Sequence, residues 1–486
     1  MRDFVPEPLF SLAAALKKET GKPLYLIGGK VRDYLAGFSM ASSDFDICAP
    51  VPAEIFMKTA LAAGFCADAA YARTGTMKIS LRQNGGNEKN DIKTEAEYAA
   101  FRSDKYVRGT HTPAETFFTE DILLDARRRD FTCNAVYYDI VADTFVDPLG
   151  GMKDIRNKLL RTVDKPGKVF GEDGLRLLRL ARFAGATGFS PTPETLDGAK
   201  TNAALIADVS PERIFAELKQ ILCSERKYGN ADGIYQALEI LDETRVLDGI
   251  FPDLAAGRNL KQRADFHNHD VLEHSLRAAA YSARANALAD VFPGIPVPFD
   301  VRLAALLHDI GKPAAYFRDG KFSDHPNVGA VLARVALEKL KAPVKTIKLV
   351  EALTKYHMYD YDLCTKENKL RKFIVLHYDI FNELLLVKQA DFSACKDDFS
   401  TAPSVTRLKN LADKMRAEGA PFTLKELAVR GNEIAPLLPS SRYVGATLEA
   451  LLLHCAVTPA DNTKERLLRL APSFAIVGGK NRNARL

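Results

Sequence analysis

The pattern of apolar and polar positions divides the chain into a mixed α/β part followed by a long helical part. Within residues 1–150, the apolar run 24–27 and the alternating run 76–81 predict β-strands, because strand side chains point alternately to two faces. Residues 90–93 follow an Asn-Gly-Gly-Asn turn sequence, so they are expected to return antiparallel to 76–81. Residues 135–140 form a further apolar strand candidate.

From about residue 170 onward, apolar residues recur with the period of an α-helix and are interrupted by Pro or Gly. The segments with this pattern are 172–187, 211–224, 231–246, 300–310, 328–341 and 443–455. No internal repeat and no low-complexity tract is found. The sequence therefore predicts an α+β protein with a small mixed β-sheet head followed by an elongated all-α body.

Length and composition are those of an ordinary globular chain with two to four domains. The chain has 486 residues, of which 47% are hydrophobic and 27% are charged. No apolar run approaches the roughly 18 residues of a membrane span, and the N-terminus lacks the basic-then-apolar order of a signal peptide. The seven cysteines form no Cys-x-x-Cys pair and are odd in number, which favours reduced thiols and a cytoplasmic location.

Basic residues are concentrated in two places, although the net charge is only +5. Residues 153–182 contain nine Lys or Arg against four Asp or Glu, and residues 461–486 contain six against two. Such local excess is what contacts with phosphate groups require. A solvated helix face remains the alternative for either stretch.

A glycine turn and two spaced aspartates follow the first predicted strand. Gly28 and Gly29 come directly after residues 24–27, and their uncovered backbone N–H groups can approach a polyphosphate. Asp44 and Asp46 lie two residues apart on the next predicted strand, so both carboxylates point to the same face. A Mg²⁺ ion that also binds substrate phosphates would resolve their repulsion. The alternative is a turn with two solvated aspartates.

The neighbours of these aspartates are predicted from the same alternation. Phe45 and Ile47 would face the core, on the opposite side of the strand from the two carboxylates. Asp91 lies on the predicted returning strand 90–93 and would bring a third carboxylate towards the pair.

Two further clusters combine basic and acidic residues. Residues 127–129 are three successive arginines, which repel one another unless an anion neutralises them, and Asp130 follows them. Glu172 and Asp173 suit the N-terminus of a helix, and Arg176 is three residues further on. Asp173 and Arg176 offer an acceptor and a donor that match the Watson–Crick edge of cytosine or adenine. An exposed charged turn and a surface salt bridge are the respective alternatives.

These motifs, in this order, resemble those of bacterial-type tRNA nucleotidyltransferases, the CCA-adding enzymes, which are close relatives of bacterial poly(A) polymerases. The resemblance covers roughly residues 20–225. It rests on the segments 28–33 (GGKVRD), 44–46 (DFD), 102–104 (RSD) with 111–113 (HTP), 128–135 (RRDFTCNA), 172–176 (EDGLR) and 210–217 (SPERIFAE). Cys133 stands where the family usually has an aliphatic residue, and Gly174 where alanine or proline is common.

The resemblance implies roles for individual residues. Asp44 and Asp46 would be the catalytic residues that hold two Mg²⁺ ions. Gly28, Gly29 and Arg32 would hold the triphosphate. The full set of nucleotide-binding residues that it implies is Gly28, Gly29, Arg32, Arg129, Asp130, Asp173, Arg176, Arg179 and Arg182. Within this set, Arg129 and Asp130 would select ribose, while Asp173 and Arg176 would read the base of CTP and then of ATP.

A second site is predicted from the distribution of histidines. Six of the nine histidines lie between residues 267 and 357, including His274 and His308, and His308 is followed directly by Asp309. Histidine nitrogens and carboxylate oxygens are ligands of divalent metals. This region, with residues 267–276 as its opening helix, resembles the HD phosphohydrolase domain. The resemblance implies that His274, His308, Asp309 and Asp391 bind Mn²⁺, Ni²⁺, Fe²⁺ or Mg²⁺.

The leading hypothesis is a template-independent CCA-adding enzyme that acts on the 3′ end of tRNA with CTP and ATP. An HD phosphatase or 2′,3′-cyclic phosphodiesterase would accompany it. A poly(A) polymerase, a CC-adding or A-adding enzyme, and an HD-type nucleotidase with a nucleotide-sensing head are the alternatives. Neither a membrane nor an obligate protein partner is expected. The predicted domains are the nucleotidyltransferase head (1–150), a helical nucleotide-selecting neck (151–260), the HD domain (261–400) and a tRNA-binding C-terminal body (401–486).

Overall fold

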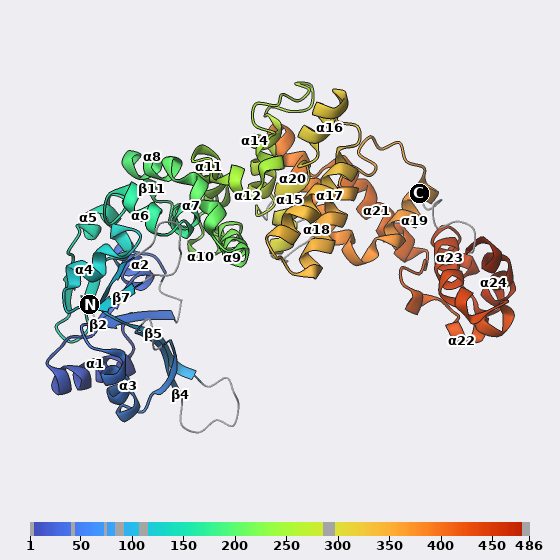
Figure 1. Ribbon diagram of the computed structural model, residues 1–486. Coiled ribbons are helices and arrows are strands. Elements are labelled where there is room, and N and C mark those ends of the chain that lie inside the picture. The colour runs from blue at the N-terminus through green and yellow to red at the C-terminus, as the bar shows by residue number, and fades with distance from the viewer. Residues whose placement is uncertain are drawn as a thin grey trace. The chain divides into compact units, whose positions relative to one another are not determined.

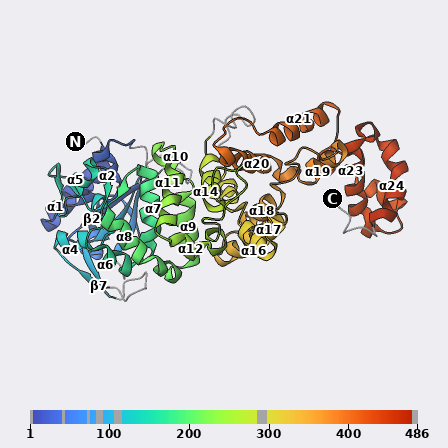
Figure 2. The ribbon, with the colours of Figure 1, turned by 90° about the horizontal axis from the view of Figure 1, so that it is seen from above.

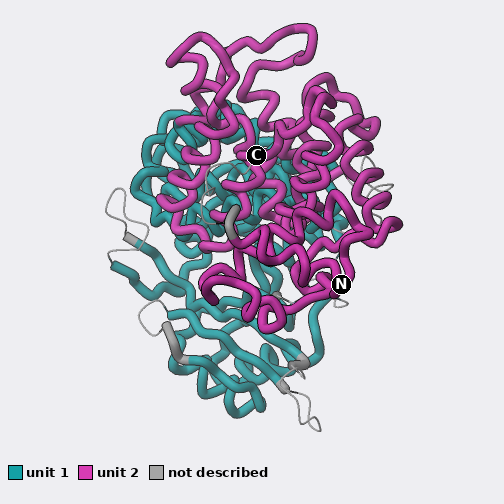
Figure 3. The backbone as a smooth tube through the Cα atoms, turned by 90° about the vertical axis from the view of Figure 1, so that its right-hand side faces the viewer, with its two compact units in different colours: residues 1–252 teal, residues 253–486 magenta. Residues whose placement is uncertain are grey.

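The computed structural model describes residues 4–39, 44–71, 75–82, 92–105, 115–284 and 297–478. The chain forms two compact units, residues 1–252 and residues 253–486 (Figure 3). The finer division into four domains stays a prediction. None of the helices in these described ranges has the length and apolar character needed to cross a membrane.

Unit 1 begins with the mixed-sheet head (Figure 1). Its main strands are β1 (Tyr25–Ile27), β2 (Asp44–Ala49), β3 (Cys66–Tyr71), β4 (Thr76–Arg82), β5 (Ile92–Ala100), β8 (Tyr137–Asp139) and β9 (Thr144–Val146). Two small ladders are formed by β6 (Arg102–Lys105) with β7 (Glu115–Phe118), and by β10 (Leu159–Leu160) with β11 (Ser190–Pro191). The helices of the head are α1 (Glu7–Thr20), α2 (Gly29–Ala36), α3 (Ala53–Ala62), α4 (Ile122–Arg127) and α5 (Gly151–Arg156).

The strand order places the glycine turn beside the acidic strand. Within the described residues the main sheet has the order β3-β4-β5-β2-β1-β8-β9, and β2 pairs parallel with β5 while the other pairs are antiparallel. Ile27, the last residue of β1, pairs with Asp46 of β2, so the turn that follows β1 begins next to this aspartate. The predicted alternation is confirmed here, because Phe45 and Ile47 are buried and Asp46 is exposed.

The predicted antiparallel pairing of the strands after residue 75 is also confirmed, as β4 with β5. Asp91 and the turn sequence between these strands lie outside the described residues. The same is true of residues 111–113. Nothing in the fold therefore tests a third carboxylate at Asp91.

The rest of unit 1 is a helical neck. Its helices are α6 (Pro166–Glu172), α7 (Leu175–Thr187), α8 (Pro193–Thr201), α9 (Pro211–Ile221), α10 (Glu225–Tyr228), α11 (Gly233–Glu243) and α12 (Val246–Ile250). In α7 the leucines at 177, 178 and 180 are buried, while the arginines at 176, 179 and 182 follow one another at intervals of three. This spacing puts the arginines on one helix face.

Helix α7 is fixed by close packing against α11, and the two helices lie side by side in both views (Figure 1 and Figure 2). A Cβ atom added to Gly185 would lie 2.4 Å from the carbonyl oxygen of Gly233. One added to Gly233 would lie 2.3 Å from that of Gly185. The backbones approach so closely only because both positions lack a side chain.

Unit 2 is helical. Helix α13 (Pro252–Ala255) begins at the last residue of unit 1. The helices that follow are α14 (Val271–Tyr281), α15 (Phe299–Leu307), α16 (Lys312–Asp319), α17 (His325–Lys339), α18 (Val344–Tyr356), α19 (Glu367–Leu376), α20 (Phe381–Lys396), α21 (Pro403–Ala417), the short α22 (Gly431–Ile434), α23 (Val444–Val457) and α24 (Lys464–Gly478). The predicted fold class, a mixed-sheet head followed by helices, is confirmed.

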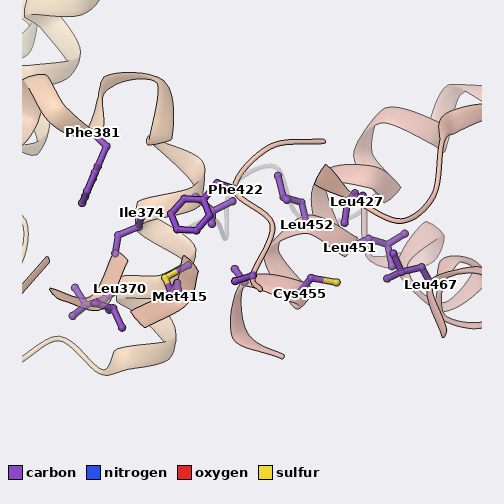
Figure 4. Close-up of a cluster of buried hydrophobic side chains, with 14 of the residues drawn as sticks. Leu370, Ile374, Phe381, Met415, Phe422, Leu427, Leu451, Leu452, Cys455 and Leu467 are labelled. Carbon is purple, nitrogen blue, oxygen red and sulfur yellow. The ribbon is translucent and has the colours of Figure 1, made fainter. Parts of the chain in front are cut away.

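The C-terminal helices share a core with the helices before them. Leu370 of α19, Phe381 of α20, Met415 of α21, Leu451 of α23 and Leu467 of α24 belong to one buried apolar cluster (Figure 4). Burying apolar surface of this kind contributes roughly 25 cal/mol per Å². The cluster therefore joins the last helices firmly to the region that contains the predicted metal ligands.

Substitution of Gly185 by alanine should destabilise unit 1. The new methyl group would overlap the carbonyl group of Gly233, and overpacking of this kind costs about 1–3 kcal/mol. Urea unfolding would measure the decrease in the free energy of unfolding. Gly167→Ala is the matched control in α6, because nothing lies within 4 Å of an added Cβ, and it should leave the free energy of unfolding unchanged or raise it by up to about 1 kcal/mol. Equal effects of the two substitutions would contradict the packing described here.

Candidate functional sites

A cavity of about 410 Å³ in unit 1 gathers the predicted nucleotide-binding residues. It is lined by Gly28, Gly29, Arg32, Asp46, Arg128, Arg129, Asp130, Asn134, Asp173, Leu175, Arg176, Arg179, Arg182, Phe183, Arg213 and Lys227. Every nucleotide-binding residue predicted from the sequence is in this set, together with Asp46. The backbone of Asp44 belongs to β2, and its side chain lies outside the described residues.

The glycine turn brings bare backbone to the cavity wall. Gly28 has φ +75°, a conformation that other residues rarely adopt, and it precedes the first turn of α2. A Cβ atom at Gly28 would lie 3.0 Å from Oδ2 of Asp46. The N–H groups at the start of a helix have no partner within the helix, so they and the helix dipole favour an anion at this wall.

Arg32 is held rigidly although it lines the cavity. Its Nε and Nη2 both donate to Oδ1 of Asp33, at 3.0 and 2.6 Å, and its Nη1 donates to Asn134 at 2.8 Å. Nη2 also donates to the hydroxyl of Tyr228, which donates in turn to Oδ2 of Asp33 at 2.5 Å. Four of the five guanidinium donors are engaged in these bonds. Arg32 thus joins α2 of the head to α10 of the neck.

Two of the three successive arginines at 127–129 form ion pairs with Asp125. Arg128 and Arg129 contact the two oxygens of this buried carboxylate at 2.7 and 2.9 Å, and Tyr137 donates to it at 2.7 Å. Burial opposes ionisation of Asp125, but the two arginines and Tyr137 outweigh it and lower the pKa of Asp125 to about 2. Much of the anionic charge that the arginines require is therefore supplied by the protein itself.

Asp130 is also held by an arginine, in this case Arg179 of α7 in the neck. It accepts from Arg179 at 2.8 Å and from Asn134 at 3.1 Å. Burial disfavours its charged form, yet Arg179 and the hydrogen bonds from Asn134 and from the N–H of Phe131 lower the pKa of Asp130 to about 2. Asp130 is consequently an anchored carboxylate at the cavity wall.

The predicted start of the helix at Glu172 is wrong. Helix α6 ends at Glu172, Asp173 has an extended backbone, and α7 begins at Leu175. The carboxylate of Asp173 accepts from the N–H of Leu175 at 3.0 Å. Glu172, the last residue of α6, pairs with Arg176 of α7 at 3.1 Å.

Arg176 has further partners that fix its direction. Its Nη1 donates to the carbonyl oxygen of Val169 at 2.8 Å, and its Nη2 donates to that of Arg128 at 2.6 Å. The guanidinium thus bridges α6 and the segment after α4. A side chain tied to backbone atoms on two sides presents its remaining face to the cavity in one orientation.

The cavity wall carries an excess of positive charge. Eight basic side chains line it against three acidic ones. Arg182 pairs with Glu217 at 3.1 Å, but burial and the neighbouring Arg179 lower its pKa below the ordinary value. Burial is the larger cause of this shift, and repulsion by Arg179 adds to it. A polyanion in the cavity would relieve this repulsion.

Asp46 borders a second cavity of about 440 Å³. This cavity is lined by Gly29, Lys30, Asp33, Phe45, Asp46, Lys78, Glu95, Ala96, Glu97 and Lys227. Glu97 of β5 pairs in register with Asp46, and Glu95 with Asp44. Asp46 therefore lies where two separate molecules could approach the same carboxylate.

The predicted ligands in unit 2 form one buried cluster. Nε2 of His274 lies 3.1 Å from Nε2 of His308 and 3.1 Å from Oδ1 of Asp391. Oδ2 of Asp309 lies 3.2 Å from Nε2 of His308 and 3.4 Å from Nε2 of His274. Helices α14 and α20 supply His274 and Asp391, while the turn after α15 supplies the adjacent His308 and Asp309.

Two more histidines, His325 and His357, complete the cluster. Nδ1 of His308, His325 and His357 lies 2.6–2.7 Å from the backbone carbonyl oxygen three residues earlier in each case. A carbonyl can only accept, so each Nδ1 carries a proton and each Nε2 is directed into the cluster. Burial opposes protonation of His308, but Asp309 and Asp391 outweigh it and raise the pKa of His308 to about 10. Burial, with His308 and His325 acting in the same direction, lowers the pKa of His357 to about 3. Neutral imidazoles and ionised carboxylates are the donor set that a divalent metal requires.

A cavity of about 660 Å³ opens on this cluster. Asp309, His325 and Asp391 line it together with the basic Arg263, Lys312 and Lys321 and the aromatic Phe266, Phe322 and Tyr361. A charged, partly aromatic wall over metal-binding groups suits a phosphate ester.

Comparisons with known proteins match these regions. Residues 24–161 match the family described as the poly A polymerase head domain, residues 188–257 the probable RNA and SrmB-binding site of polymerase A, and residues 271–391 the HD domain. An A-adding tRNA nucleotidyltransferase of Deinococcus radiodurans is 30% identical over 463 residues, which cover 93% of this chain and 91% of the relative. The chain belongs to the tRNA nucleotidyltransferase and poly(A) polymerase family.

Two other relatives agree with this assignment. A multifunctional CCA protein of Acinetobacter baumannii is 30% identical over 346 residues, 69% of this chain and 74% of that protein. The crystal structure of the Bacillus stearothermophilus CCA-adding enzyme in complex with CTP has the same fold, with a TM-score of 0.66 at 24% identity over 98% of this chain and 100% of that one. This nucleotidyltransferase also carries an HD domain, which runs from the start of α14 to Asp391.

Several residues that support the two candidate sites are not apparent from the motifs. Asp125 lies three and four residues before Arg128 and Arg129, and this helical spacing of opposite charges is a signal that could have identified it. Tyr228 contacts residues almost two hundred positions away, and no local pattern indicates it. His325 and His357 lie close in sequence to the predicted ligands, but only the fold shows that they face Asp309.

Replacement of Asp125 by asparagine should destabilise the nucleotidyltransferase by about 3 kcal/mol at neutral pH, because two largely buried guanidinium groups would lose their counter-charge. The carboxylate has a lowered pKa, so its contribution is complete above its ordinary value of 3.8 and is lost as the pH falls towards 2. Urea unfolding at several pH values should therefore show the difference from wild type shrinking between pH 5 and pH 2.

Asp164→Asn is the control for this experiment. Asp164 pairs with the exposed Lys168 at 2.8 Å, and exposed pairs contribute about 0–1 kcal/mol. Substitution of Asp164 should change the free energy of unfolding very little at any pH. A pH-independent loss in the Asp125 variant would show that the ionised carboxylate is not what stabilises the arginines.

Proposed function

We propose that this nucleotidyltransferase is a CCA-adding enzyme, which transfers CMP, CMP and AMP from CTP and ATP to the 3′ end of tRNA. The observation that carries the proposal is that Asp46 borders two cavities, a basic one suited to a triphosphate and a second one on its other side. A carboxylate that is shared by two cavities suits a reaction between a nucleotide and a second substrate. The tRNA terminus would enter the second cavity.

The reaction is a displacement at the α-phosphorus. The 3′-oxygen of the RNA forms a bond to this phosphorus, the bond to the oxygen that bridges to the β-phosphorus breaks, and pyrophosphate leaves. The hydroxyl proton passes to solvent or to a neighbouring base. Asp44 and Asp46 would hold Mg²⁺, which supplies positive charge to the phosphates when bound.

The remaining residues of the cavity would orient the nucleotide. Gly28 and Gly29 would bind phosphate oxygens through backbone N–H groups, and Arg32 would add its charge from its fixed position. Asp130 and Arg129 would contact ribose. Asp173 and Arg176 would form hydrogen bonds with the base, and the backbone ties of Arg176 would limit which base edge fits.

Addition of A alone is the second candidate. It is favoured by the relative from Deinococcus radiodurans, which is named an A-adding enzyme and aligns with 93% of this chain. A poly(A) polymerase is a further alternative, because it would share the head. The HD-type nucleotidase with a sensing head is less favoured, since it has no need of an acidic residue between two cavities.

Three tRNA substrates distinguish these functions. The purified protein would be incubated with tRNA that lacks its last one, two or three nucleotides, and with labelled CTP or ATP. A CCA-adding enzyme should incorporate two C residues and then one A. An A-adding enzyme should act only on tRNA that ends in CC, and a poly(A) polymerase should form long A tails. Absence of any incorporation would overturn the proposal.

A second activity is proposed for unit 2. His274, His308, Asp309 and Asp391 would hold Mn²⁺, Ni²⁺, Fe²⁺ or Mg²⁺, which polarises a phosphoryl group or a water molecule when bound. The support is the buried donor set below a basic and aromatic cavity. The substrate class is a phosphate ester such as a 2′,3′-cyclic phosphate at a damaged RNA end. We also propose a cytoplasmic location, where tRNA ends are processed and where all seven cysteines would remain free.

The two activities should be separable by substitution. Asp46→Ala should reduce nucleotide addition by more than about 100-fold, because a metal ligand contributes several kcal/mol, and should leave phosphohydrolysis unchanged. His308→Ala should have the opposite effect. Labelled nucleotide incorporation and phosphate release from 2′,3′-cyclic ends are the two measurements. The controls are Asp68→Ala on the exposed side of β3 and His269→Ala, which should alter neither activity.

A further inference from the structure

Lys227 of the neck lies where the two cavities around Asp46 meet. Gly29, Asp46 and Lys227 are the residues that line both cavities. Asp46 is a carboxylate, and Gly29 contributes bare backbone at the start of α2. Among the described residues that line these cavities, Lys227 is therefore the only cationic side chain that borders the proposed triphosphate site and the proposed site of the RNA end at the same time.

The next residue, Tyr228, fixes α10 to the head. Its hydroxyl accepts from Nη2 of Arg32 at 2.9 Å and donates to Oδ2 of Asp33 at 2.5 Å. Its ring stacks on that of Phe38, which lies just beyond the end of α2, with the ring centroids 4.4 Å apart and an angle of 18° between the ring planes. Polar and aromatic contacts thus hold the end of α10 against the head, so the backbone of Lys227 is fixed beside both cavities.

The start of α10 is fixed by two other helices of the neck, α7 and α11. Ser224, which precedes α10, is buried. A Cβ atom added to Gly185 of α7 would lie 3.0 Å from Oγ of Ser224, and one added to Gly233 of α11 would lie 3.2 Å from it. Ser224 therefore packs directly against both helices. The place of Lys227 depends on this packing as well as on the contacts of Tyr228.

The side chain of Lys227 differs in kind from the arginines of the first cavity. Arg32 and Arg176 are each tied by several hydrogen bonds, so their guanidinium groups are fixed in direction. Lys227 is exposed, and its ammonium group is a compact point charge on a flexible stem. Such a group can follow negative charge that moves from one part of a substrate to another during a reaction.

We propose that Lys227 is a further catalytic residue of the nucleotidyltransferase, whose ammonium group contacts a non-bridging oxygen of the α-phosphate. The inference rests on the proposed function and adds a residue to it. The 3′-oxygen of the RNA forms its bond to the α-phosphorus while the bond to the oxygen that bridges to the β-phosphorus breaks, and pyrophosphate leaves. This phosphorus is the atom at which the contents of the two cavities meet. The ammonium group stabilises the charge on the phosphoryl oxygens in the transition state and keeps its proton throughout.

The experiment measures single additions of AMP to tRNA that lacks only its terminal A, which a CCA-adding and an A-adding enzyme would both extend. At saturating ATP and with enzyme in excess, Lys227→Met should lower the rate constant about 100-fold, as the loss of one donor to a transition state does. Lys227→Arg retains the charge and should lower it by less than about 10-fold. The ATP concentration that gives half the maximal rate should change little in both variants, because the arginines of the first cavity remain.

Sulfur substitution locates the contact on the α-phosphate. ATPαS, in which sulfur replaces one non-bridging α-oxygen, exists as two isomers. Sulfur accepts hydrogen bonds weakly, so the isomer with sulfur towards Lys227 should lose part of the contribution of the lysine. The ratio of the rate constant for ATP to that for this isomer should therefore be smaller in Lys227→Met than in wild type, and effects of sulfur on bound Mg²⁺ cancel in this comparison. If the ratios of both isomers were the same in variant and wild type, contact with the α-phosphate would be refuted.

Arg226→Met is the matched control. Arg226 precedes Lys227 on α10, carries the same charge and lines neither cavity, so its substitution should leave the rate constant unchanged. Circular dichroism and thermal unfolding verify that each variant is folded. Equal rate constants for Lys227→Met and wild type, or a change confined to the half-saturating ATP concentration, would refute the catalytic role of Lys227. Absence of addition by wild type on every tRNA substrate would instead overturn the proposed function.

Discussion

Pairing of buried arginines with carboxylates behind them is the interaction on which the nucleotidyltransferase cavity depends. Asp33 holds Arg32, Asp125 holds Arg129, and the neck contributes Arg179 to Asp130. Glu172 and Glu217 hold Arg176 and Arg182 in the same manner. Without these partners, the concentrated positive charge would oppose folding. With them, the arginines are fixed in place before any substrate arrives.

This pairing also joins the head to the neck. Arg179 of α7 contacts Asp130 of the head, and Tyr228 of α10 contacts both Arg32 and Asp33 of α2. The same polar contacts therefore define the cavity and hold its two walls together. A substitution that removes one carboxylate is expected to affect stability and nucleotide binding at the same time, so both must be measured.

The HD domain also buries many charged and polar side chains close together, but these are histidines and aspartates instead of arginines. Nδ1 of three buried histidines is directed to a backbone carbonyl, so Nε2 of each ring faces the carboxylates of Asp309 and Asp391. The head concentrates cations that attract an anion, whereas this cluster concentrates electron pairs that attract cations. Each arrangement carries an electrostatic cost in the absence of its ligand, and this cost is what indicates a binding site.

The sequence by itself determined the fold class, the strand that carries Asp46 and the predicted residues that the fold gathers at each candidate site. Each of these depends on local patterns, namely alternation in strands, helical spacing and motifs of short range. Only the tertiary structure decided which partner each charge has. Glu172 proved to end a helix rather than begin one, Tyr228 reaches Arg32 from a distant helix, and His325 and His357 converge on Asp309. The physical reason is that ion pairs and metal clusters depend on distance in space, which a sequence pattern specifies only within one helix or strand.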